Sequence, residues 1–309
     1  MSKYVLGIDI GGTNFRMGLV DEEHELHEFV RYKTSETFCA DEADQSIDKF
    51  VRLIRSYMDE HSAYDVGMIV IGVPGWVSNN HSYVYTIAKV PGLDRVELGQ
   101  IIEESVGIKT YVGNDINALL MRDIVLRDLD PDRNKTILGF YIGTGFGNAL
   151  YINGEMYLGK HGVAAEIGHI PLYGVTDVCN CGAVGCVETR ACGLILAKIQ
   201  KERFPDLEFD ELFVKHPDDP VLVQFVKDCA LPIATEITLF DPDHVIIGGG
   251  VFRVKGFPYE LFEKEIRDRT LHPLPAEDIE FMYSEDYNSN GVIGSGIIGH
   301  RIMKSENGD

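Results

Sequence analysis

The feature that most constrains the fold of this chain is an internal repeat of a strand, a glycine turn and a second strand. The segment "LGIDIGGTNFRMGLVD" (6–21) aligns without gaps on "LGFYIGTGFGNALYIN" (138–153), 132 positions further on, with identity at four of the first six positions. Chance similarity between apolar strands is the alternative. A duplication predicts two similar domains, each opening with a β-hairpin whose glycine turn faces a shared cleft.

Strands and helices alternate after the first copy of this repeat. We predict a strand in "LHEFVRYKT", a helix over 44–60 with Asp44 as its N-cap, a buried strand in "DVGMIVIGVPG" and a helix in "VELGQIIEESVG". The segment "KTYVGNDINALLMRDIVL" reads as a strand running into a helix. This alternation predicts an α/β fold with an at least partly parallel sheet.

We place the first domain at 1–115 and the second at 116–289. The last helix, 290–309, packs back on the first domain in this interpretation, although its glycines weaken the helix prediction.

Composition narrows the class of protein further. The chain has 309 residues, enough for about two domains, and a formal net charge of −21. That charge opposes non-specific attraction to nucleic acid or to anionic membranes. No apolar stretch has the length of a membrane span, and Asp9 comes too early for a signal peptide, so we expect a cytoplasmic protein. In a reducing cytosol, clustered cysteines favour metal binding or catalysis over disulfides.

Three turns rich in glycine offer backbone N–H groups to an anion. A glycine there lets the backbone approach a phosphate with no side chain in the way. Tight hairpins also use glycine for steric reasons, but the set of three predicts a phosphate-rich nucleotide held from several sides. Asp9, at the end of the first strand, is the candidate to orient Mg²⁺ or its water shell, and its counterpart in the second repeat is Tyr141. The turns are Gly11–Gly12–Thr13, Gly143–Thr144–Gly145 and Gly248–Gly249–Gly250.

The stretch "GNDINA" places Asn114 and Asp115 where a strand hands over to a helix, at the expected hinge between the domains. A helix N-cap is the purely structural interpretation of such residues. The functional interpretation makes Asp115 a general base that accepts the proton of a substrate hydroxyl, while Asn114 fixes another hydroxyl. A base of this kind contributes about 10²–10⁴-fold in rate.

A histidine and three cysteines form the remaining cluster, in the order His169, Cys179, Cys181 and Cys186. Three cysteines and one histidine are a usual tetrahedral zinc set, and four protein ligands leave no open position for a catalytic water. The interval after the histidine is longer than in common zinc fingers, so ordinary thiols in a loop are the alternative. A metal-closed loop over 166–188 would bring Glu166 and Glu188 close together. Cys39, Cys192 and Cys229 are isolated, and we interpret them as small packing residues.

Together these motifs closely resemble the ROK family of sugar kinases and related repressors. The resemblance covers almost the whole chain in the right order, and the EIGH…CxCGxxGC element is specific to that family. It implies an actin-like ATPase fold, in which two domains of the RNase H type close on ATP and a hexose. The motifs are "GIDIGGTNFRMGLVD", "GVPGWV", "GNDINA", "GTGFG", "AAEIGHI…CNCGAVGCVET" and "LFDPDHVIIGGGV".

The resemblance also implies roles for individual residues of this chain. Asp115 is the implied catalytic base for transfer of the γ-phosphate to the 6-hydroxyl of an aldohexose. A homodimer is implied as well. The implied sugar contacts are Gly75, Asn114, Asp115, Glu166, His169 and Glu188. The implied nucleotide contacts are Asp9, Gly11, Gly12, Thr13, Thr144, Gly145, Gly249 and Gly250. The implied structural zinc is bound by His169, Cys179, Cys181 and Cys186.

Finer features favour one group within the family. The tail and "GCVETRACG" look most like the bacterial D-allose kinases. Many relatives have a Pro-Asn pair near the sugar where this chain has Ala88 and Lys89, and glucose, mannose or an N-acetylated hexosamine are the alternative substrates. Family repressors carry a helix-turn-helix ahead of the first strand, which here begins near residue 4, so we do not expect a repressor. The non-enzymatic alternative is a sugar sensor without catalytic activity. The presence of Asp9, Asn114 and Asp115 argues against this alternative.

Overall fold

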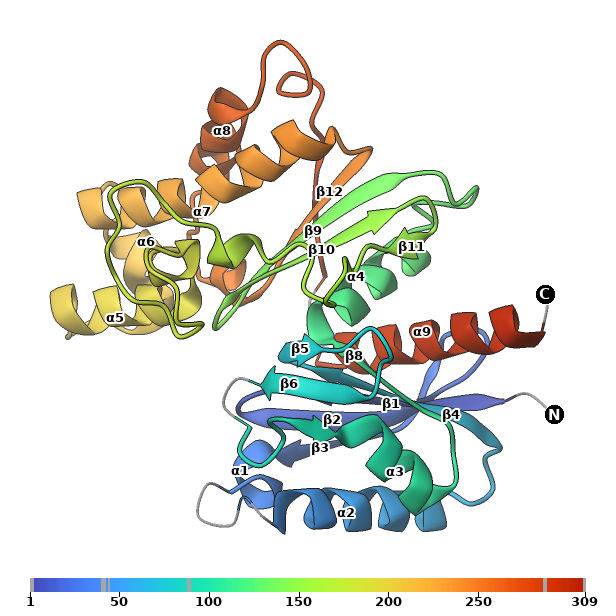
Figure 1. Ribbon diagram of the computed structural model, residues 1–309. Helices are drawn as coiled ribbons and strands as arrows, with labels where there is room; N and C mark the ends of the chain where they lie inside the picture. The colour runs from blue at the N-terminus through green and yellow to red at the C-terminus, as the bar shows by residue number, and fades with distance from the viewer. Residues whose placement is uncertain (1–2, 40–42, 44, 88–89, 286–287, 308–309) are drawn as a thin grey trace. The chain divides into compact units, whose positions relative to one another are not determined.

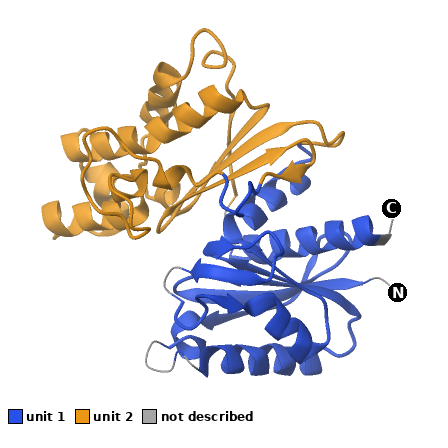
Figure 2. Cartoon of the chain, in the orientation of Figure 1, with its two compact units in different colours: residues 1–129, 158–164, 287–309 blue, residues 130–157, 165–286 orange. Residues whose placement is uncertain are grey.

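A computed structural model describes residues 3–39, 43, 45–87, 90–285 and 288–307. The chain divides into two compact units (Figure 2). Unit 1 contains residues 1–129, 158–164 and 287–309, and unit 2 contains 130–157 and 165–286. The division differs from the predicted one, because the chain leaves unit 1 after Leu129 and not after Asp115. The reason is that helix α4 (Asp115–Leu126) packs along helix α9 (Asn290–Asn307) within unit 1. Asp44 and the Ala88–Lys89 pair lie outside the described residues.

Unit 1 is built on a five-stranded sheet in the order β3-β2-β1-β4-β8 (Figure 1). Strand β2 is antiparallel to β1 and β3, whereas β1, β4 and β8 are parallel to one another. A small antiparallel sheet, β5-β6-β7, follows β4. The strands are β1 (Tyr4–Ile10), β2 (Asn14–Val20), β3 (Leu26–Lys33), β4 (Val66–Val73), β5 (Gly75–Val77), β6 (Tyr83–Ile87), β7 (Val96–Glu97) and β8 (Thr110–Asn114).

Helices cover both faces of this sheet (Figure 1). On one face, α2 (Ser46–Glu60) and α3 (Leu98–Val106) bury apolar side chains against alternate residues of β1 and β2, while the short α1 (Thr34–Thr37) follows β3. On the other face lie α4 and α9, and Ile298 and Ile302 of α9 pack on Val5 and Val70. The period-2 pattern of the central strands is therefore buried on both sides.

The glycines of α9 allow this helix to lie close to its neighbours. A methyl group at Gly294 would lie 1.9 Å from the carbonyl oxygen of Ala118 in α4, and one at Gly299 would lie 2.6 Å from the Val5 side chain. Only glycine allows the helix to approach α4 and the sheet so closely. The C-terminal helix therefore packs on the first half of the chain, and the glycines that weakened the helix prediction make the contacts.

Unit 2 repeats the sheet of unit 1 strand for strand. Its order is β11-β10-β9-β12-β13, with β10 antiparallel to β9 and β11, and with β9, β12 and β13 parallel. The first strand of each unit occupies corresponding positions, because Thr136 minus Tyr4 is 132 and Ile142 minus Ile10 is 132. The strands are β9 (Thr136–Ile142), β10 (Phe146–Ile152), β11 (Glu155–Met156), β12 (His244–Gly248) and β13 (Phe281–Tyr283).

The second strand of the repeat shows a one-residue offset that the ungapped sequence alignment misses. Ile10 pairs with Phe15 in unit 1, whereas Ile142 pairs with Phe146 in unit 2. Four residues lie between this pair in the first hairpin, and three lie between the corresponding pair in the second. Counted from the turn, Phe15 therefore corresponds to Phe146 and Met17 to Asn148. A one-residue change of register exchanges the two faces of a strand, so this offset decides which side chains enter the core.

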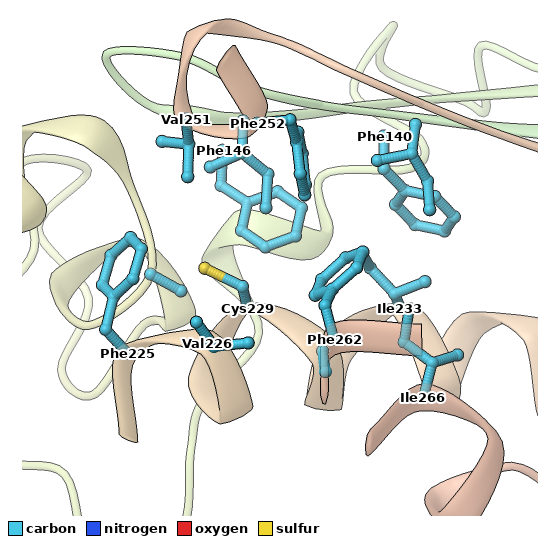
Figure 3. Packing of buried hydrophobic residues seen from close by; sticks show 14 of the residues in the cluster. Phe140, Phe146, Phe225, Val226, Cys229, Ile233, Val251, Phe252, Phe262 and Ile266 are labelled. Atoms are coloured by element: carbon cyan, nitrogen blue, oxygen red, sulfur yellow. The ribbon is translucent and has the colours of Figure 1, made fainter. Parts of the chain in front are cut away.

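Helices of unit 2 pack on one face of its sheet around an aromatic core (Figure 3). Phe140 and Phe146 of the hairpin contact a layer formed by α7 and α8, which includes Phe225, Cys229 and Phe262. Cys192 and Cys229 are buried, as expected for packing residues, and Cys39 of unit 1 is half-buried. The helices of unit 2 are α5 (Gly193–Arg203), α6 (Leu212–Lys215), α7 (Pro220–Phe240) and α8 (Tyr259–Arg269), with short 3₁₀ turns η2 (Ile167–His169), η3 (Val187–Thr189), η4 (Phe209–Glu211) and η5 (Gly250–Arg253).

Among the described residues, none of the helices has both the length and the apolar character needed to cross a bilayer.

Candidate functional site

The first glycine turn, in unit 1, is held by residues on both sides of it. The N–H of Gly11 donates to the carbonyl of Asn14 at 3.0 Å, which closes the hairpin. The Thr34 hydroxyl donates to the Gly11 carbonyl at 2.6 Å, and its N–H donates to the Thr13 carbonyl at 2.9 Å. Backbone carbonyls of the turn are thereby engaged, and the turn is fixed by the start of α1.

Asp9 lies at the carboxyl end of β1, next to this turn. Its carboxylate accepts a hydrogen bond from Arg16 on β2 at 3.1 Å, since the two residues are partners across the hairpin. A methyl group at Gly291, in the first turn of α9, would lie 2.5 Å from the carboxyl carbon of Asp9. Burial raises the pKa of Asp9 above its ordinary value, and the Arg16 guanidinium only partly opposes this shift. A cation would restore the charged form and thus bind favourably here.

A second group of predicted residues lies at the same edge of the sheet. Asn114 ends β8, and its side-chain oxygen accepts the N–H of Ile116 at 2.8 Å, so it is the N-cap of α4. Its amide nitrogen donates to the carbonyl of Gly75 at 3.2 Å. An amide nitrogen carries two hydrogens, so this bond leaves a second donor on Asn114. The N-cap interpretation is confirmed, and it brings Gly75 and Asn114 together.

Asp9 and Asp115 lie on either side of Gly72. Gly72 of β4 is the strand partner of Asp9, and a methyl group on it would lie 3.4 Å from the Cα atom of Asp115. Asp115 is the first residue of α4 and is partly exposed. The carboxyl ends of three adjacent parallel strands thus supply two acids at one edge of the sheet, which is where α/β proteins place their ligands.

In unit 2, two of the predicted glycine turns adjoin one another. The Gly143 N–H donates to the Gly145 carbonyl at 3.0 Å, which makes the hairpin turn between β9 and β10. Gly249 has a φ of 102°, and a side chain on it would meet the backbone of Ile142 at 2.4–2.6 Å. Both the backbone conformation and this close approach require glycine. The steric interpretation of this glycine therefore holds, and it also places the Gly249–Gly250 turn beside the Gly143–Gly145 turn.

Two glutamates approach each other near these turns. The Glu188 carboxylate accepts the N–H of Phe146 at 2.9 Å. Glu166 is close enough to Glu188 for the two charges to interact, and burial together with the Glu188 carboxylate raises the pKa of Glu166 to about 7. The expectation that the loop over 166–188 would bring the two carboxylates together agrees with this geometry.

The histidine and the three cysteines converge in the same loop. The ligand atoms of His169, Cys179, Cys181 and Cys186 all lie within 4.8 Å of one another. Nδ1 of His169 is 3.6 Å from Sγ of Cys179, and the sulfurs of Cys181 and Cys186 are 3.7 Å apart. Two sulfurs at about 2.3 Å from a tetrahedral zinc are about 3.8 Å apart, and a sulfur and a nitrogen are about 3.6 Å apart. The donor set therefore fits a zinc ion in both chemistry and spacing.

Sequence reasoning missed three residues that the structure places against predicted ones. Arg16 pairs with Asp9, Gly291 packs on the Asp9 carboxylate, and Gly193 donates its N–H to the Gly143 carbonyl at 2.7 Å. The position of Arg16 opposite Asp9 follows from the register of the hairpin, and hence from the length of its turn. Nothing in the local sequence signals the other two.

The arrangement of two units with the same strand order is that of an actin-like ATPase. The match of the ROK family profile to residues 5–302 shows that the chain belongs to the ROK family. A glucokinase of Thermotoga maritima is 25% identical over 96% of this chain and 98% of its own length. An N-acetyl-D-glucosamine kinase of Haemophilus influenzae is 26% identical over 94% of this chain and 97% of its own length.

A solved structure shares the fold. A ROK family glucokinase from Streptomyces griseus, in complex with glucose and AMPPNP, superposes with a TM-score of 0.76 at 24% sequence identity. The superposition covers 96% of this chain and 98% of that one. The predicted fold class is confirmed.

Proposed function

We propose that this protein is an ATP-dependent hexokinase that converts D-allose to D-allose 6-phosphate. The enzyme is an ATP-dependent sugar kinase of the ROK family, whose relatives named above act on glucose and N-acetyl-D-glucosamine. The observation that supports it most is the pair of acids, Asp9 and Asp115, on either side of Gly72 at one edge of the unit 1 sheet.

The two acids would divide the work of phosphoryl transfer. Asp115 would accept the proton of the sugar 6-hydroxyl as that oxygen attacks the γ-phosphorus of ATP. Asp9 would hold hydrated Mg²⁺, which neutralises charge on the phosphates. Backbone N–H groups of the three glycine turns would bind the phosphates without side-chain obstruction.

The proposed sugar contacts form two groups of residues. In unit 1, Asn114 and the Gly75 backbone, held together at 3.2 Å, would meet one part of the hexose. In unit 2, Glu166, His169 and Glu188 would meet another. Because Nδ1 of His169 faces the cysteine sulfurs, Nε2 is the nitrogen that remains for a sugar hydroxyl.

The proposed zinc would be structural. His169, Cys179, Cys181 and Cys186 supply four ligands, which fill a tetrahedral shell. Such a shell has no position for an activated water, so the ion would orient the loop and the His169 ring.

The choice of D-allose depends on the similarity of the tail and of "GCVETRACG" to the bacterial D-allose kinases. Glucose and N-acetyl-D-glucosamine are the first alternatives, because the relatives are named for them. A site that hydrogen-bonds the axial 3-hydroxyl of allose would leave a polar group unpaired when glucose binds, which can separate the two epimers strongly.

A coupled ADP-release assay over a panel of hexoses tests the proposal. We expect D-allose to give the highest kcat/KM, 6-deoxyallose to give no turnover, and EDTA to abolish the reaction. A higher kcat/KM with glucose, mannose or N-acetylglucosamine would replace allose as the substrate. Absence of ADP release with every hexose, combined with retained sugar binding, would favour the sugar sensor instead.

A further inference from the structure

Glu188 does more in this structure than its predicted role as a sugar contact requires. Its carboxylate lies on the Gly143–Gly145 turn, 2.9 Å from the Phe146 N–H that follows the turn. A methyl group on Gly145 would lie 2.5 Å from Oε2 of Glu188. The φ of Gly145 is not positive, so the conformation of its backbone does not demand glycine. A side chain at position 145 would therefore require the Glu188 carboxylate to move away from the turn.

The segment that carries Glu188 also holds the turn by its backbone. The Gly193 N–H, at the start of α5, donates to the Gly143 carbonyl at 2.7 Å. A methyl group on Gly193 would lie 2.4 Å from that same oxygen, so only glycine allows the contact. Residues 188–193 therefore fix the turn at both of its ends.

A second segment of the loop, which carries Gly168, also contacts Phe146. A methyl group on Gly168 would lie 2.6 Å from the Phe146 carbonyl oxygen. Gly168 directly precedes His169, and Glu188 follows Cys186 by two residues. Both of these contacts with Phe146 are thus made by residues within two positions of a candidate metal ligand.

We propose that Glu188 is a positioning residue for the nucleotide, which fixes the Gly143–Gly145 turn and couples it to the metal loop. A loop closed by zinc holds Glu188 and Gly168 against Phe146, and the N–H groups of the turn are then preorganised for phosphate. Loss of the metal or of the carboxylate weakens ATP binding as well as sugar binding. The inference rests on the proposed function, because it takes this turn as part of the nucleotide site.

The first experiment separates coupling from simple packing by a double-mutant cycle. We expect Glu188→Ala to raise the Kd for AMPPNP, measured by calorimetry without sugar, by about tenfold, as for loss of a hydrogen bond to a charged group. Glu188→Gln keeps an acceptor for the Phe146 N–H and is expected to restore most of the affinity. Gly145→Ala is expected to weaken binding through its clash with the carboxylate. Adding Glu188→Ala to Gly145→Ala should then cost nothing further or recover affinity.

The second experiment follows the turn itself. Hydrogen exchange of the Phe146 amide, measured without any ligand, should speed up in Glu188→Ala and after zinc is removed with a chelator. It should remain slow in Glu188→Gln. The matched control is the Ile10–Phe15 hairpin of unit 1, whose exchange should not respond to the chelator.

Three results would overturn the inference. These are an AMPPNP affinity unchanged in Glu188→Ala, strictly additive effects of the Gly145 and Glu188 substitutions, or Phe146 exchange that is indifferent to zinc. If the native protein binds no AMPPNP although its Phe146 amide responds to zinc and to Glu188→Ala, the proposed function fails and the mechanical coupling stands. The two failures are therefore distinguishable.

Discussion

The two hairpin turns of the repeat share a fold but are held by different means. In unit 1 the turn after β1 is fixed by one residue, Thr34, through its hydroxyl and its N–H. In unit 2 the turn after β9 is fixed by Glu188, in the long segment between β11 and α5, and by Gly193, the first residue of α5. Strand β3 has eight residues, whereas its counterpart β11 has two. Unit 2 thus has a shorter strand at this position and, after it, a loop whose residues can hold a metal ion.

The residues beside the two turns have diverged as well. Asp9 in unit 1 corresponds to Tyr141 in unit 2, and the buried Met17 corresponds to Asn148. One unit thus keeps an acid at the ligand edge and an apolar core, whereas the other has an aromatic residue at that edge and a polar residue in its core. The shared fold supplies the frame, and under the proposals made above the divergence would leave Mg²⁺ binding to unit 1 and positioning by the loop to unit 2.

The largest expected effect comes from Asp115, the acid that follows β8. Asp115→Asn removes the proposed base and should lower kcat by about 10²–10⁴-fold while the sugar Kd stays within a few-fold. Glu285, two residues after the end of β13 in unit 2, is a control acid beside the strand that corresponds to β8, and Glu285→Gln should leave kcat nearly unchanged. ADP release and sugar titration measure both. A near-normal kcat in Asp115→Asn would refute the assignment.

The next effect tests the residue near the carboxyl end of the first strand in each repeat, Asp9 in unit 1 and Tyr141 in unit 2. Asp9→Asn removes the carboxylate proposed to hold hydrated Mg²⁺ and should lower kcat/KM for ATP by about 10²-fold. The Mg²⁺ concentration needed for half-maximal rate should rise. Tyr141→Phe is the control in the other unit, and we expect it to retain activity within about twofold of wild type, a change of about 0.4 kcal/mol in activation free energy. Equal losses in both variants would mean that the units have not divided the work.

The metal loop provides a third contrast between the units. Cys179→Ser should lose zinc and, because His169 is then no longer oriented, weaken sugar affinity by about 10-fold. Atomic absorption measures the metal and calorimetry measures the Kd. Cys39→Ser, in unit 1, should change neither. If zinc is lost while the sugar Kd stays the same, the loop stabilises the fold only.

The last prediction concerns stability and not activity, and it involves the buried Glu236 in unit 2. Burial raises the pKa of Glu236 on α7 to about 8, and its hydrogen bond from Asn148 only partly opposes this. The folded state therefore keeps the proton to a higher pH than the unfolded state, whose pKa is near 4.5. The free energy of unfolding should fall as the pH rises from 4.5 to 8, by at most about 1.4 kcal/mol per pH unit.

Glu236→Gln should remove this slope, as measured by denaturant unfolding at several pH values. The exposed Glu202 of α5 offers a control, and Glu202→Gln should keep the wild-type slope. A slope that survives in Glu236→Gln would assign the pH dependence to other groups.

Much of the fold was predictable because hydrophobic period and turn residues are local signals. The helix predicted over 44–60 is observed over Ser46–Glu60, and the strand that ends in Asn114 passes into α4 as predicted. The alignment of the two hairpins was wrong by one residue in the second strand. The length of a turn is decided by what its backbone must bond to, and the two turns bond to different partners.

Some features of the candidate site were likewise predictable from local sequence, and others were not. Sequence alone was enough to predict the family, the two-unit fold, the acids at the ends of β1 and β8, and the four candidate metal ligands, because each belongs to a contiguous motif. Only the tertiary structure decided that Arg16 faces Asp9, that α9 glycines pack against α4, and that Glu188 occupies the space a side chain at Gly145 would need. These contacts join residues from 7 to 176 positions apart (16 − 9 and 294 − 118), and no local pattern encodes the distance between such atoms.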